Sequence, residues 1–150
     1  MRPSRRNSRR AGTAMIEFAI GFTVLVAVFT GTFQFGYTFF QYNNLENAAA
    51  SGARYASLIA YDSATATPTS TFSNAVKNMV VYGSPTGGTV PVVKNLDTSN
   101  VVLTVTFANG IPSLMTVAVT GFSIDSIFAT TTLTNKPLVT YTYQGIWSPI

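Results

Sequence analysis

The feature that most constrains the fold is a long stretch near the N-terminus without any charge. No charged side chain occurs from Phe18 to Leu45, and the bulkiest apolar residues lie before Phe40. An α-helix needs about 20 such residues to cross the ~30 Å hydrocarbon core of a bilayer. Core helices of soluble proteins rarely run this long without a charge. The stretch therefore predicts a membrane-spanning helix, which we assign to residues 13–42.

The charges on the two sides of this stretch differ sharply. Five arginines lie within the first ten residues, and the positive-inside rule then places the N-terminus in the cytoplasm. Beyond Gly12 the chain has four basic and five acidic side chains, a net charge of −1. This balance argues against a nucleic-acid-binding body. Only 9% of all residues are charged, against about 25% in soluble domains, so much of the surface is expected to meet lipid or protein.

Parts of the N-terminal region also resemble other targeting signals. A secretory signal could be cleaved after the small residues at 48–50, but its apolar core is only about 7–15 residues long, shorter than the run here. The arginine pairs at 5–6 and 9–10 also resemble twin-arginine signals. Glycines at 21, 31 and 36 are either tolerated in a simple anchor or form a packing face for other membrane helices.

The helix is expected to continue past the membrane to about Ala60, because the following segment is rich in alanine. Residues 43–61 form this amphipathic extension. Its apolar side consists of Leu45, Ala49, Gly52, Ala56 and Ile59, at helical spacing. Glu46, Arg54 and Ser57 are predicted to lie away from that side.

Residues 62–150 are expected to form a small exported domain. A break containing Pro68 precedes a short helix, capped by Thr71 or Ser73 and ending near Val81. Period-two patterns then predict three strands, joined by short turns into an antiparallel sheet. The predicted strands are Val101–Phe107, Leu114–Ile124 and Leu138–Gln144, while residues 126–135 are ambiguous. The fold class is thus α+β: a long N-terminal membrane-spanning helix, then a domain with a short helix and an antiparallel sheet.

The composition restricts the chemistry that the chain can perform. The sequence contains no cysteine and no histidine, which removes thiol nucleophiles, histidine bases and most zinc sites. We therefore predict no catalytic residue, no metal, no cofactor and no enzymatic activity. Tyr141, Tyr143 and Trp147 could stack a ligand, although aromatic residues in this setting more often pack within a sheet.

Three segments resemble the TadE-like proteins of the tight-adherence (Flp) pilus system. The first is RRAGTAMIEFAI, in which a basic leader and a glycine precede a glutamate followed by Phe and Ala. The second is the later helix ending in Gly52-Ala53-Arg54-Tyr55-Ala56, a motif similar to that of the family. The third is the turn Val80–Gly83, followed by strands.

The resemblance implies processing by a prepilin peptidase between Gly12 and Thr13, which removes the basic leader of residues 1–12. Thr13 then carries a new ammonium group, and Glu17 becomes the fifth residue. In pilins the carboxylate at that position is thought to pair with the ammonium of a neighbouring subunit. The alternative is a carboxylate that merely sits among headgroups near Arg9 or Arg10.

The function implied is that of a non-catalytic minor pilin or pseudopilin that supports adhesion or secretion. Its partners would be the prepilin peptidase, other pilus subunits, the inner-membrane assembly platform and the lipid bilayer, with no nucleic acid. It would cross the bacterial inner membrane once, with its C-terminal domain in the periplasm, and act in the pilus or at its base. Two alternatives stay open: a type II secretion-like pseudopilin, and a simple membrane-anchored exported binding domain.

Overall fold

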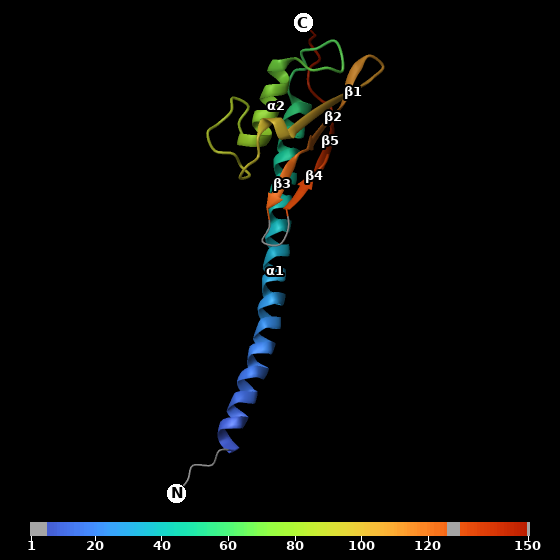
Figure 1. The fold of residues 1–150 in the computed structure, drawn as a ribbon. Helices are drawn as coiled ribbons and strands as arrows, with labels where there is room; N and C mark the ends of the chain where they lie inside the picture. Colours follow the sequence, from blue (N-terminus) through green and yellow to red (C-terminus); the bar gives the residue numbers. More distant parts are fainter. Residues whose placement is uncertain (1–5, 126–129, 150) are drawn as a thin grey trace. The chain divides into compact units, whose positions relative to one another are not determined.

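The computed structural model describes residues 6–125 and 130–149 and shows an α+β fold, as predicted (Figure 1). Contacts between Cα atoms divide the chain into a unit that ends at Tyr37 and a second unit that begins at Thr38. The elements in chain order are α1 (Arg6–Leu58), α2 (Ser70–Tyr82), the short 3-10 helix η1 (Thr98–Asn100), β1 (Val101–Ala108), β2 (Ile111–Val119), β3 (Phe122–Asp125), β4 (Thr130–Leu133) and β5 (Leu138–Thr142).

Helix α1 confirms that the helix continues past the uncharged stretch, because it extends without a break to Leu58. It begins at Arg6, before the span predicted at residues 13–42. The part of α1 that belongs to the second unit contributes one side of a hydrophobic core, around which α2 and the strands lie (Figure 1). Fully buried core residues include Leu45, Tyr61, Val76, Val80, Met115, Val117 and Val119.

The buried side of α1 is wider than the predicted one. Leu45, Ala49 and Ala56 are fully buried as expected, but Ala48 and Ala53 are buried too. The placement of Ser57 away from the core was wrong, because this residue is only 3% exposed. Its hydroxyl donates a hydrogen bond to the carbonyl of Arg54 at 2.7 Å, so burial leaves no orphaned polar hydrogen.

The short helix α2 was predicted at the right place, but its predicted N-cap was wrong. Thr69, rather than Thr71 or Ser73, is the capping residue, and its hydroxyl oxygen accepts a hydrogen bond from the N–H of Phe72. The Thr69 hydroxyl also donates to a carboxylate oxygen of Asp62. The helix ends at Gly83, whose φ of 70° is left-handed, as is common after a helix C-terminus.

Three antiparallel strands form one sheet in the order β1-β2-β5. The predicted first strand is confirmed as β1, and the predicted third strand is confirmed as β5, which ends at Thr142. The single strand predicted from Leu114 to Ile124 is instead two strands, β2 and β3. Gly121 between them has a left-handed φ of 67°, which turns the chain out of the sheet.

Strand β3 pairs with β4 in a separate two-stranded sheet. Strand β4 occupies part of the segment that the sequence left ambiguous. The rest of that segment, residues 126–129, lies outside the described residues, as does the start of the basic leader at residues 1–5.

Candidate functional site

The first candidate site is the predicted cleavage point, which lies within the helical segment of α1. Gly12 and Thr13 are both exposed. A Cβ atom built on Gly12 would meet no atom within 4 Å, so there is open space beside this glycine. Glu17, one helical turn beyond Thr13, is exposed as well. The three residues therefore lie close along one exposed stretch of helix.

The side chains that follow expose an unusual amount of apolar surface. Fifteen large apolar residues between Met15 and Phe40 are each 45–75% exposed. Exposed apolar patches on this scale mark contact with lipid or protein rather than with water. The helix from Gly12 to Leu58 is long and apolar enough, by length and composition, to cross a membrane.

Three threonine side chains in this stretch form hydrogen bonds within the helix. The hydroxyls of Thr23, Thr30 and Thr32 donate to carbonyl oxygens one turn earlier, at 2.8–2.9 Å. In a bilayer such internal bonding removes the cost of an unsatisfied donor. Two aromatic pairs also form along the helix, Phe18 with Phe22 and Phe29 with Phe33.

The segment Gly52–Ala56, which was predicted to resemble a family motif, has a packing role in the second unit. A Cβ atom on Gly52 would lie 2.1 Å from Cγ2 of Val80, so only glycine allows α1 and α2 to approach this closely. Ala53 and Ala56 are fully buried beside this crossing. Tyr55 is half-buried and packs against the core. Four of the five motif residues are thus explained by packing.

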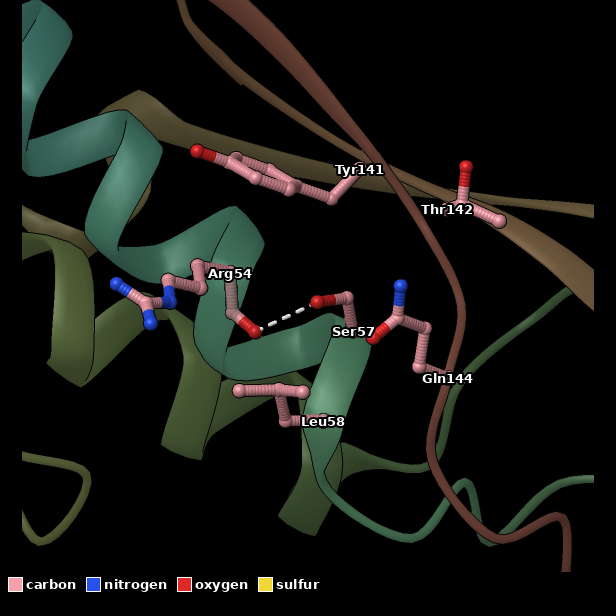
Figure 2. Close-up of a pocket in the computed structure, with 6 residues that line it drawn as sticks. All are labelled: Arg54, Ser57, Leu58, Tyr141, Thr142 and Gln144. Carbon is pink, nitrogen blue, oxygen red and sulfur yellow. Dashed lines mark hydrogen bonds between the residues drawn. The ribbon is translucent and has the colours of Figure 1, made fainter.

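Arg54 is the exception, because its side chain is exposed and lines a pocket of about 310 Å³ (Figure 2). Tyr141 lies across from the helical residues, and the other lining residues are Ser57, Leu58, Thr142 and Gln144 (Figure 2). Among the described residues, the Arg54 guanidinium forms no ion pair or hydrogen bond. The pocket therefore holds one positive charge, with no acidic side chain in its lining.

The C-terminal segment holds the end of α1 in place. The Tyr143 hydroxyl accepts a hydrogen bond from the N–H of Tyr61 at 2.9 Å, and lies 3.0 Å and 2.7 Å from the carbonyl oxygens of Ile59 and Ile146. One hydroxyl hydrogen can serve only one of these carbonyls at a time. The N–H of Gln144 donates to the carbonyl of Ser57 at 2.8 Å, which satisfies an otherwise orphaned group in the last turn of the helix.

The aromatic residues of this segment favour packing over ligand stacking. The ring of Tyr143 meets that of Tyr61 at 6.4 Å, and Trp147 meets Phe107 at 6.3 Å, both edge to face. Burial raises the pKa of the Tyr61 and Tyr143 phenols above their ordinary value of 10.0. Tyr141 differs from Tyr61 and Tyr143, since it is 39% exposed at the pocket.

Sequence reasoning did not find the pocket, although it singled out Arg54 and Tyr141 separately. Residues of α1 and of the C-terminal segment meet there across more than 80 positions of sequence, and no local pattern encodes that contact. In the described part of the chain, no three acidic residues gather as metal ligands could. The pocket offers a ligand the Arg54 guanidinium, the Gln144 amide and the Tyr141 ring, together with hydroxyl groups.

Among the comparisons with known proteins, a match comes from a family model alone. No curated protein and no solved structure matches the chain. The family model described as TadE-like protein matches residues 12–54. This range begins at the predicted cleavage glycine, covers the exposed apolar helix, and ends at Arg54 within the packing motif. The resemblance to TadE-like proteins is therefore confirmed over residues 12–54 of the chain.

Proposed function

We propose that the chain is a non-catalytic minor pilin or pseudopilin of the tight-adherence pilus machinery, matured by removal of residues 1–12. The observation that carries this proposal is the family match over residues 12–54. It coincides with an exposed apolar helix preceded by five arginines. In this proposal residues 13–42 cross the inner membrane, residues 43–61 extend the helix, and residues 62–150 form the exported domain.

Cleavage would serve assembly by changing the charge at the start of the span. It removes the arginines and creates an ammonium group on Thr13, one turn from Glu17. An ammonium in one subunit and a carboxylate in the next can pair as subunits stack, and desolvated charges are tolerated only when paired. The partners would be other pilus subunits and the inner-membrane assembly platform, with the prepilin peptidase acting first.

Intact mass and N-terminal sequencing of the membrane-extracted protein test the processing step. The mature chain should begin Thr-Ala-Met-Ile-Glu. Gly12→Leu should block processing, because a bulky side chain fills the space that glycine leaves for the peptidase. A simple membrane anchor would keep its arginines, so an unprocessed wild-type chain in cells with an active prepilin peptidase would refute the proposal.

A second experiment separates processing from assembly. Glu17→Gln leaves the Thr13 ammonium without its counter-charge, and losing one partner of a buried pair costs about 3–5 kcal/mol. Cleavage should survive, while co-purification with other pilus subunits falls. Normal assembly with glutamine at position 17 would show that the carboxylate only sits among headgroups.

The proposed orientation can be tested independently. A reporter that is active only after export, fused at Ile150, should function, because the arginines hold the N-terminus in the cytoplasm. A fusion at the same site that is active only in the cytoplasm would contradict this topology.

A further inference from the structure

The outer edge of β5 is open in the second unit. Strand β5 is the last strand in the order β1-β2-β5, and no other described strand pairs with it. The N–H of Tyr143 donates to the carbonyl of Ser113, and the N–H of Val119 donates to the carbonyl of Pro137. The backbone N–H and C=O groups of the odd-numbered residues of this strand therefore point toward β2. In an antiparallel pair the backbone groups alternate, so those of Leu138, Thr140 and Thr142 point outward.

This edge lacks the usual protection against strand pairing. Edge strands are normally blunted by charges, prolines, bulges or a covering element. Within β5 there is no charge and no proline, and each of its five side chains is at least partly exposed. The other edge of the sheet differs, because β1 contains a register shift after Thr106 and buries the side chains of Val101 and Val105.

The Arg54 pocket adjoins this open strand. Tyr141 and Thr142 both line it, although consecutive side chains of a strand point to opposite faces. A pocket that touches both residues must lie at the edge or end of the strand. The pocket brings an exposed guanidinium that has no counter-charge among the described residues, together with the amide of Gln144.

We propose that the outer edge of β5 and the Arg54 pocket together dock an extended segment of another polypeptide that carries a carboxylate. In strand addition, main-chain hydrogen bonds supply affinity and side-chain pockets supply specificity. The outward backbone groups of Leu138, Thr140 and Thr142 would pair with the incoming strand. Arg54 would take its Asp or Glu side chain, since guanidinium binds carboxylate through two parallel hydrogen bonds.

Pairing with a second copy of this chain through its β5 fits the site less well. Strand β5 has the sequence LVTYT and no carboxylate, so pairing two copies through β5 leaves Arg54 without a counter-charge. The site lies in the second unit and does not involve the leader, so this proposal and the proposed function can fail separately.

The test uses the full chain in detergent micelles and a fluorescent peptide, Ac-TVTEVTVT-NH2, read by anisotropy. A matched peptide has Gln in place of Glu. The Glu peptide should bind about tenfold more tightly than the Gln peptide, the size expected for one charge-assisted contact. Arg54→Gln should erase this difference. Lys94→Gln, which removes an exposed charge outside the pocket, should preserve it.

The backbone contribution is tested from both sides. Thr140→Pro removes an outward N–H and no backbone hydrogen bond to β2, so it should weaken binding of both peptides. Both this variant and the control Thr140→Val lose the hydrogen bond between the hydroxyls of Thr140 and Thr116 on β2, so only the proline variant should lose binding. The proline variant could disturb the sheet, so an independent test uses wild-type protein and two N-methylated peptides. Each peptide lacks the backbone N–H donors along one of its two edges, and only one edge can pair with β5. Only one of the two methylated peptides should lose binding.

Three results would overturn the proposal. One is equal affinity for the Glu and Gln peptides. Another is equal loss, or no loss, with the two methylated peptides. The third is displacement of the peptide by another occupant. Displacement by glucuronate alone would assign the site to a sugar acid, and displacement by self-association of the chain, seen in sedimentation, would assign it to a second copy.

Discussion

Two stretches of the same helix differ in whether their apolar side chains are exposed or buried. Residues 15–40 carry bulky side chains that are mostly exposed, whereas the buried residues between 48 and 57 are all small. The glycines differ likewise: Gly36 has open space around it, while Gly52 faces Val80 at 2.1 Å. Bulky apolar residues need a non-aqueous surrounding, and small residues allow another helix to come close. Size, more than hydrophobicity, separates the two environments.

The largest expected difference between the stretches concerns a new charge. Val28→Asp places a carboxylate near the centre of the span, where insertion is disfavoured by about 2.5–3.5 kcal/mol. Ser51→Asp adds the same charge on the exposed side of residues 45–57 and should change stability by less than about 0.5 kcal/mol. Alkaline extraction of membranes should release Val28→Asp and retain Ser51→Asp. Equal retention of both variants would remove the distinction between the two stretches.

A smaller effect is expected from adding one methyl group at each glycine. Gly52→Ala forces Val80 aside and should lower the free energy of unfolding by about 1–3 kcal/mol. Gly36→Ala meets no atom and should leave unfolding of the second unit unchanged. Urea unfolding followed by the single tryptophan, Trp147, measures both. If the cost comes from the clash, the double variant Gly52→Ala/Val80→Ala should be more stable than the sum of the single effects predicts.

The smallest expected effect concerns the hydrogen bonds that hold the end of α1. Tyr143→Phe removes the hydroxyl that contacts Tyr61, Ile59 and Ile146, and should cost about 1 kcal/mol. Tyr141→Phe removes a hydroxyl from an exposed ring and should cost close to nothing. An equal loss in both variants would show that the hydrogen bonds at Tyr143 do not stabilise this end of the helix.

The same tyrosine should make stability depend on alkaline pH. Burial raises the pKa of Tyr143 in the folded chain, so the unfolded chain loses its phenolic proton first, near pH 10. The contribution is complete below that pH and is lost as the pH rises through the folded pKa. Unfolding free energy should therefore fall above about pH 10, less steeply in Tyr143→Phe, where only Tyr61 of this pair remains.

The sequence alone determined the features that depend on local composition. A run of uncharged residues predicts a spanning helix because its length must match a bilayer, and alternation predicts β1 and β5 because side chains alternate across a strand. The small residues at 49, 52 and 56 identified the buried side of α1. The family resemblance rested on the same local segments, which is why it could be recognised before the fold.

Only the tertiary structure decided the features that depend on distant partners. Ser57 is buried, and its carbonyl accepts the N–H of Gln144, 87 positions later; its polar side chain gave no sign of either. The strand predicted from Leu114 to Ile124 divides at Gly121, where a left-handed φ is visible only in the backbone. The open edge of β5 and its pocket likewise depend on strand order and on the return of the chain to α1, since neither is a property of any single segment.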